Sequence, residues 1–174
     1  FIMAGSVMSY GGVSTTLMDF CDMITGRMRG GLGATNTLLS TFMGGMSGSS
    51  CADAAFEARM LVPEMTKRGF SLGYSSAITA ATSCITPIIP PGISMVIYAT
   101  AASCSVGNMF LGGYVPGLLI CLTMLFLNWV ISKRRGYKPT RETRPTKAEF
   151  LRQTGKSMWA LLLPIFIIVG LRMG

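Results

Sequence analysis

A proline-rich break lies inside the longest uncharged stretch of this chain. No Asp, Glu, Lys or Arg occurs between Phe70 and Ser132, yet Thr86-Pro87-Ile88-Ile89-Pro90-Pro91-Gly92 interrupts the helical pattern within that stretch. In hydrocarbon every backbone N–H and C=O must be satisfied, so unwound backbone is tolerated there only inside protein or beside an aqueous cavity. Secondary transporters place such broken helices at their substrate and ion sites. The break therefore indicates both a class of protein and a place to look for its site.

The composition supports a membrane protein. Half of the 174 residues are hydrophobic, 13% are charged, and the mean hydropathy is +0.52. A soluble domain of this size would have to bury the whole uncharged stretch, which its small volume hardly allows. We therefore expect an all-α integral membrane protein.

The net charge of +8 does not indicate a nucleic-acid partner. Nine of the fifteen basic residues fall between Lys133 and Lys156, opposed only by Glu142 and Glu149. A basic loop between two apolar segments is typical of the cytoplasmic side of a membrane protein. A nucleic-acid surface would also need aromatic or hydrogen-bonding residues among the cations.

Cysteine and histidine usage argues against several chemistries. The five cysteines are irregularly spaced in apolar surroundings and form no C-x-x-C pair, which favours small buried hydrophobes over a disulfide or zinc framework. Histidine is absent. An intramembrane serine enzyme would need a base to activate its nucleophile, and none is placed to do so. We therefore expect no enzymatic activity.

The segments before residue 70 predict a helical hairpin. Phe1–Tyr10 indicates the end of a spanning helix, and Val13–Met28 an amphipathic helix that either crosses the membrane or lies at its interface. We then expect two helices of about 16–18 residues over residues 30–68, meeting at the tip Ser47-Gly48-Ser49-Ser50. In this interpretation Gly44-Gly45 and the tip itself break the helical pattern late in the first helix. A capping box over Ser50–Asp53 starts the second helix, and Lys67-Arg68-Gly69 ends it.

The basic clusters order these segments across the membrane. Arg27/Arg29, Lys67/Arg68 and the loop at 133–153 should share the cytoplasmic side. The hairpin then enters and leaves from that side, a broken helix over about 71–105 crosses once, and a span over 114–132 crosses back. Residues 1–132 would form one transport unit, and 154–174 would begin the next span. Because the chain starts and stops beside apolar sequence, we interpret it as part of a longer polypeptide.

The tip and the break offer the same chemistry. Both supply hydroxyls and carbonyls released from helical hydrogen bonds, and neutral oxygens of this kind bind Na⁺. Helices starting at Ser50 and near Ile93 would also direct their positive ends at a carboxylate. Simpler interpretations stay open: small residues serve close helix packing, and proline serves a kink. Asp53 is either a helix cap, a substrate contact or, with Glu57, a proton carrier.

Two long motifs carry a family resemblance. Gly44-Gly45-Met46-Ser47-Gly48-Ser49-Ser50-Cys51-Ala52-Asp53-Ala54-Ala55 and Thr86-Pro87-Ile88-Ile89-Pro90-Pro91-Gly92-Ile93-Ser94-Met95-Val96-Ile97-Tyr98 resemble the large membrane subunit of TRAP (tripartite ATP-independent periplasmic) transporters. The resemblance covers essentially the whole chain. Cys51 stands where the family usually has Ala or Val, and Thr86 stands where it usually has Gly.

The resemblance implies an elevator-type carrier of two inverted repeats, of which this chain holds about the first. It implies Na⁺ as the coupling ion, bound by Ser47, Gly48, Ser49, Ser50, Thr86, Pro87 and Pro90. We assign the substrate contacts to Ser50, Asp53, Pro91 and Gly92.

The expected partners are a small TRAP membrane subunit, a periplasmic binding protein and the lipid bilayer of the bacterial inner membrane. The expected cargo is an organic acid anion of C4-dicarboxylate, sialic acid or keto-acid type. A proton-coupled carrier and a pore or structural subunit are the alternatives.

Overall fold

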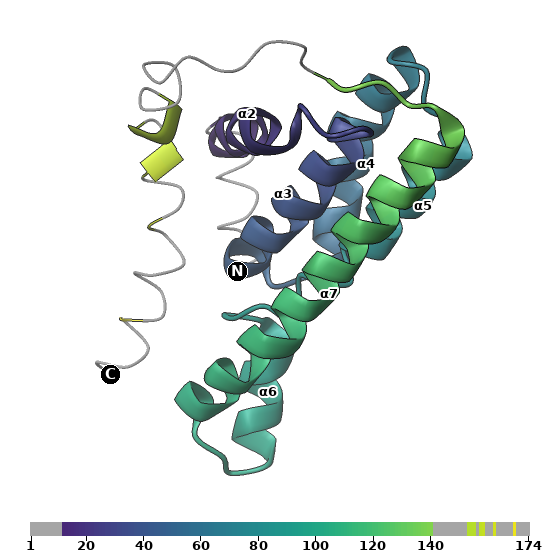
Figure 1. Ribbon diagram of the computed structural model, residues 1–174. Helices are drawn as coiled ribbons and strands as arrows, with labels where there is room; N and C mark the ends of the chain where they lie inside the picture. Colours follow the sequence, from purple (N-terminus) through teal and green to yellow (C-terminus); the bar gives the residue numbers. More distant parts are fainter. Residues whose placement is uncertain (1–11, 141–152, 156, 159–161, 163–168, 170–174) are drawn as a thin grey trace.

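The chain folds into helices. The computed structural model describes residues 12–140, 153–155, 157–158, 162 and 169 (Figure 1). Across these residues it forms α2 (Val13–Thr25), α3 (Gly31–Ser47), α4 (Ser50–Lys67), α5 (Leu72–Thr82), α6 (Ile93–Ala101) and α7 (Val106–Arg135). Within them the one strand-like pairing is an isolated bridge between Arg29 and Pro139. The all-α expectation is confirmed for this part of the chain, whereas the segment expected over Phe1–Tyr10 and most of that over 154–174 lie outside the described residues.

Helices α3 and α4 form an antiparallel hairpin whose connection is only Gly48 and Ser49. Gly48 adopts φ +60°, a conformation that favours glycine, and Ser49 is the residue before the first turn of α4. The far end of α4 closes as predicted: Gly69 has φ +86°, and the Phe70 and Gly69 N–H groups donate to Met65 and Thr66. This is the Schellman arrangement.

Helix α3 continues past Gly44-Gly45 and ends at Ser47, where the predicted tip begins. One local prediction for the hairpin is wrong. The capping box over Ser50–Asp53 does not form, because Ser49 is the N-cap residue and no side chain caps the first turn. Asp53 does lie in that first turn, but its carboxylate hydrogen-bonds to Thr86 in the break.

The break is longer than the predicted Thr86–Gly92. Helix α5 ends at Thr82, and α6 begins at Ile93. Ile85 and Thr86 still donate to carbonyls three residues back, so the chain tightens before it unwinds. Pro87 disfavours helical geometry at Thr86, the residue before it, so the helix does not resume there. The chain then folds back on itself: a Cβ at Gly92 would lie 2.4 Å from the Pro87 carbonyl oxygen.

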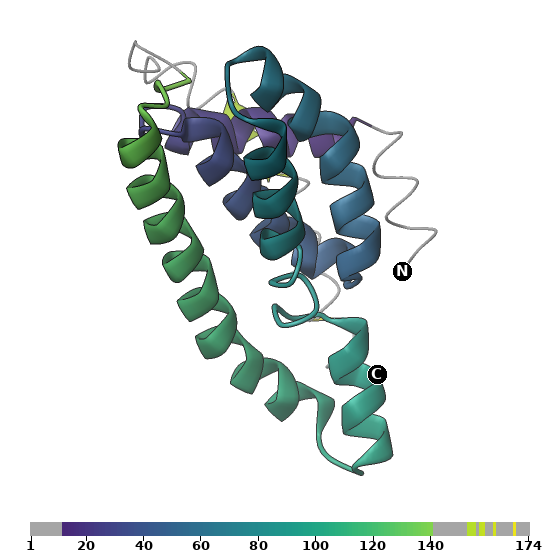
Figure 2. The ribbon, with the colours of Figure 1, turned by 90° about the vertical axis from the view of Figure 1, so that its right-hand side faces the viewer.

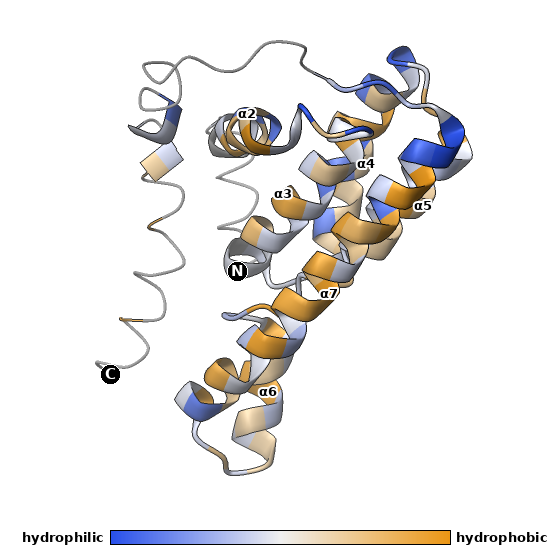
Figure 3. Ribbon diagram, in the orientation of Figure 1, coloured by the Kyte–Doolittle hydropathy of each residue, from blue (hydrophilic) through white to orange (hydrophobic). Residues whose placement is uncertain are grey.

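Helix α7 is the long element of the structure and begins earlier than the predicted 114. It runs for 30 residues, about 45 Å, and continues through Pro116. In the described part of the chain it alone is long and apolar enough to cross a membrane. Figure 3 shows that most of its residues are hydrophobic, and it ends in the hydrophilic residues Lys133–Arg135.

Helix α2 runs across the other helices rather than along them (Figures 1 and 2). It packs on the hairpin through a cluster made of Leu17, Cys21, Leu39, Met43 and Leu61. At 13 residues it measures about 20 Å, less than the hydrocarbon thickness of about 30 Å. The length favours the interfacial interpretation of this segment over a full crossing.

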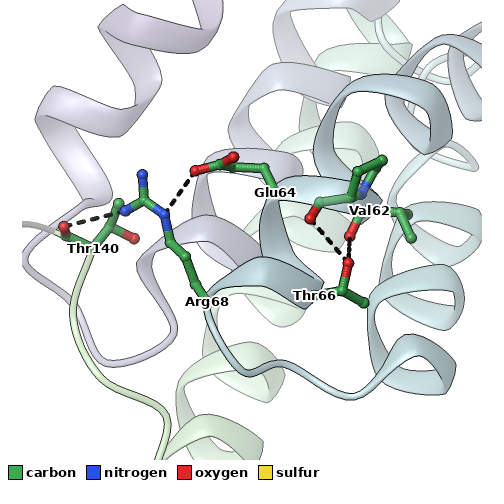
Figure 4. Close-up of polar contacts among 6 residues, drawn as sticks. Val62, Glu64, Thr66, Arg68 and Thr140 are labelled. Carbon is green, nitrogen blue, oxygen red and sulfur yellow. Dashed lines mark hydrogen bonds and ion pairs between the residues drawn. The ribbon is translucent and has the colours of Figure 1, made fainter.

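The basic ends of three elements lie together. Arg29, which follows α2, bridges to Pro139 beyond α7. Arg68 at the end of α4 pairs with Glu64 at 2.9 Å and donates to the Thr140 carbonyl at 3.3 Å, as Figure 4 shows. Beside them Phe70 stacks on Tyr137 with ring centroids 4.2 Å apart. The described residues of the charge clusters expected on one side of the membrane therefore share one end of the structure.

Candidate functional site

The hairpin tip lies against the break. A Cβ at Gly48 would come within 3.0 Å of the Ile93 backbone nitrogen and 3.3 Å of the Pro91 carbonyl oxygen. One turn earlier, a Cβ at Gly44 would lie 3.1 Å from the Thr86 carbonyl oxygen. Glycine at both positions lets the backbone of α3 approach the backbone of the break. The two motifs, about forty residues apart in sequence, thus form one site.

The predicted sodium ligands gather at this contact. Ser47, Gly48, Thr86 and Pro90 are buried, while Ser49, Ser50 and Pro87 are partly buried. Pro91 and Gly92, predicted to contact substrate, are also buried, and Asp53 is only 1% exposed. Through the approaches of Gly48 to Pro91 and of Gly44 to Thr86, the tip and the break lie close together; the roles of these residues as ligands stay predictions.

Two polar atoms at the site lack a partner among the described residues. They are the Ser47 hydroxyl and the Asp53 Oδ1. Ser47 is 5% exposed. A buried oxygen without a hydrogen bond costs about 1–3 kcal/mol, so native proteins rarely leave one unless a bound ion, water or ligand satisfies it.

A hydroxyl and carboxylate network lies behind the tip and links both arms of the hairpin to the break. The Thr86 hydroxyl donates to Asp53 Oδ2 over 2.5 Å. The Ser40 hydroxyl lies 2.8 Å from each carboxylate oxygen of Glu57, which is fully buried. Thr86 Oγ1 also lies 3.4 Å from the Ser40 carbonyl oxygen.

Sequence reasoning missed Ser40, although a signal was present. Asn36, Ser40, Gly44 and Ser47 follow one another at intervals of four, four and three residues, which places them on one face of α3. That face meets α5 and the break, where Asn36 donates to Thr79 and accepts from Thr82. A polar stripe in an uncharged membrane helix indicates a buried contact rather than a lipid-facing surface.

Two helix N-termini meet at the same place. Helix α4 starts at Ser50 and α6 at Ile93. A Cβ at Gly48, two residues before α4, would lie 3.0 Å from the Ile93 backbone nitrogen, so the two helix starts are close together. Because the first N–H groups of a helix have no partner within it, two convergent N-termini favour a negatively charged group between them.

The site lies well inside the length of α7. The Gly113 position of α7 contacts the Ile88 carbonyl, and the Gly117 position contacts the Ile89 side chain. These glycines lie about 11–17 Å from the start of α7 and about 27–33 Å from its basic end. An ion or anion at the break would therefore sit far from both ends of the helix.

Comparison with known proteins decides the family. The family model described as "Tripartite ATP-independent periplasmic transporter, DctM component" matches residues 1–174. The chain belongs to this family. It is 34% identical over 174 residues to the sialic acid TRAP transporter permease SiaT of Haemophilus influenzae (strain 86-028NP). It is 32% identical over the same length both to the 2,3-diketo-L-gulonate large permease YiaN of Escherichia coli (strain K12) and to the C4-dicarboxylate large permease DctM of Pseudomonas aeruginosa (strain PAO1).

These relatives show to which class of protein the chain belongs and what share of their length it spans. All three match across 100% of the chain, which spans 28% of SiaT and 40% of YiaN and DctM. They are transport permeases, not enzymes, so the expectation of no enzymatic activity is confirmed. The TRAP large-permease chain is thus a membrane protein, with one candidate span in its described part.

Proposed function

We propose that this chain forms the first half of the ion and substrate site of a sodium-coupled importer of organic acid anions. The observation that supports the proposal most strongly is the contact between hairpin tip and break. This contact brings the tip, with the hydroxyl groups of Ser47, Ser49 and Ser50, next to the carbonyl groups of the break and to two helix N-termini.

The neutral oxygens suit a sodium ion. Na⁺ prefers hard oxygen ligands, and unwound helices supply them as carbonyls. Pro87, Pro90 and Pro91 cannot donate backbone hydrogen bonds, which releases carbonyls that a continuous helix would use. The Ser47 hydroxyl, which has no partner among the described residues, adds one candidate ligand.

The helix N-termini suit the carboxylate of the cargo. Ser50, Asp53, Pro91 and Gly92 surround the two helix starts, so a bound anion would meet N–H groups from both. The relatives are named for sialic acid, 2,3-diketo-L-gulonate and C4-dicarboxylates. All three cargoes are organic acids, which supports a carboxylate as the shared recognition element of this chain.

The family supports the rest of the assembly. We propose a small TRAP membrane subunit and a periplasmic binding protein as partners, in the bacterial inner membrane. In this proposal the hairpin is re-entrant, and the unit moves as part of an elevator-type carrier. The depth of the break along α7 supports a site reached from either side by such movement.

The test is uptake by the full-length permease, reconstituted with its small subunit and its binding protein. Proteoliposomes receive labelled sialic acid, a C4-dicarboxylate or a keto acid under an imposed sodium gradient. We expect saturable uptake of one of these acids that stops when choline replaces sodium outside. Uptake driven equally by a proton gradient alone would contradict sodium coupling and favour the proton-coupled alternative. Conductance that does not saturate would favour a pore.

A further inference from the structure

Thr86 joins three separate segments through one oxygen atom. Its side chain is fully buried at the start of the break, beside Pro87. The hydroxyl oxygen lies 2.5 Å from Asp53 Oδ2 on α4 and 3.4 Å from the Ser40 carbonyl oxygen on α3. A single side chain of the break thus contacts both arms of the hairpin.

Counting hydrogen-bond donors shows which acceptor receives the hydrogen of the Thr86 hydroxyl. A threonine hydroxyl has one hydrogen to donate, and an ionised carboxylate only accepts. The hydroxyl of Ser40 also lies near Asp53, but it donates to Glu57, whose two oxygens are each 2.8 Å away. Thr86 is therefore the donor that Asp53 Oδ2 depends on, while Asp53 Oδ1 has no partner among the described residues.

The same residue fixes backbone that the proposed cation site needs. The Thr86 carbonyl oxygen faces Gly44 of α3, and Pro87 follows directly. A hydrogen bond from Thr86 to Asp53 holds the start of the break against α4, because the first turn of α4 is anchored next to the tip. This bond therefore helps to fix the distance between the tip oxygens and the break carbonyls.

We infer that the Thr86 hydroxyl is a positioning group that sets sodium affinity by holding the break to the hairpin through Asp53. This inference rests on the proposed sodium site and adds a residue role to it. The group acts on the arrangement of the ligands, and the inference does not require the hydroxyl to touch the ion.

The test uses the purified full-length permease and needs no identified cargo. The melting temperature is measured against increasing sodium chloride, with choline chloride as the ionic-strength control, which gives the sodium concentration for half-maximal stabilisation. Thr86→Val removes the hydroxyl at nearly constant volume, and Thr86→Ser keeps it. Thr82→Val is the matched control, because Thr82 is equally buried and its hydroxyl also bonds α3, at Asn36, outside the tip and break contact.

We expect Thr86→Val to raise the half-maximal sodium concentration about fivefold or more, and Thr86→Ser to restore it to within about twofold of the wild type. Thr82→Val should lower the melting temperature without sodium but leave the half-maximal concentration unchanged. Equal sodium dependence in Thr86→Val and the wild type would overturn the inference alone, as would an equal rise in Thr82→Val. A wild-type protein that sodium stabilises no better than choline would overturn the inference together with the sodium proposal.

Discussion

At the scale of single residues, the site depends on where the protein omits a side chain and where it leaves an oxygen unsatisfied. Gly44 and Gly48 let the hairpin touch the break, because a Cβ at either position would lie within about 3.1 Å of backbone atoms there. Ser47, which lies between them, is buried with a hydroxyl that has no partner in the described structure. A packing role alone does not account for that hydroxyl, since alanine would pack equally well without the desolvation cost.

Replacing Ser47 by alanine separates the ligand role from the packing role. We expect Ser47→Ala to raise the sodium concentration for half-maximal uptake about tenfold, because a buried charge-assisted contact contributes roughly 1.5–3 kcal/mol. The amount of Ser47→Ala protein in the membrane should equal that of the wild type. Ser76→Ala serves as the control, because Ser76 is exposed on α5 away from the tip. Unchanged sodium dependence in Ser47→Ala would leave only the backbone carbonyls and the other tip serines as ligands.

At the scale of elements, polar side chains fix the helices to one another. Asn128 of α7 accepts from the Tyr74 hydroxyl of α5 at 2.6 Å and donates to the Gly30 carbonyl, just before α3, at 3.2 Å. A Cβ at Gly33 would overlap its side-chain oxygen at 2.2 Å. One buried amide thus joins three elements at the basic end, opposite the tip. Polar contacts of this kind hold membrane helices together where the hydrophobic effect cannot.

Asn128→Ala should therefore loosen the bundle. We expect a loss of about 1–2 kcal/mol of stability, since the Tyr74 hydroxyl and the Gly30 carbonyl would both lose a partner. The measurement is thermal unfolding of the detergent-solubilised full-length protein. Asn108→Ala is the control on the same helix, because Asn108 is exposed near the start of α7 and should change the melting temperature little. Equal losses in the two variants would contradict the joint role of Asn128.

Local sequence patterns predicted where the helices start and end better than they predicted the contacts between distant residues. The glycine and serine tip, the Lys67-Arg68-Gly69 end of α4 and the interruption after α5 follow from backbone rules that operate within a few residues. The capping box was wrong because Asp53 accepts from Thr86, a residue 33 positions away, and no local pattern reveals that competitor. Ser40 lies on the polar face of α3 that the spacing reveals, but its partner Glu57 on the other arm of the hairpin could not be read from that face. The glycine pattern at Gly44-Gly45 does not interrupt α3, because glycine at position 44 serves close approach to the break.

At the scale of the whole molecule, the positions of the basic residues and the lengths of the helices support the same arrangement across the membrane. The residues that follow α2, α4 and α7 meet at one end through Arg29, Arg68, Pro139 and Thr140. The turn between α6 and α7 at Ser103 and Cys104 lies at the other end of α7 (Figure 2). If α7 crosses the membrane, the hairpin enters from the basic side and ends partway across, where its tip meets the break. The proposed site requires this topology.

Labelling from the two sides of the membrane tests that topology most directly. Single cysteines are placed at Lys67 or Lys138 in a full-length protein whose other cysteines are removed, and a third protein keeps only the native Cys104. A membrane-impermeant maleimide is then applied to right-side-out and inverted vesicles. We predict that positions 67 and 138 react only from the cytoplasmic side and Cys104 only from the opposite side. Labelling of positions 67 and 138 from opposite sides, or of Cys104 from the same side as both, would contradict a hairpin that returns to the side it enters.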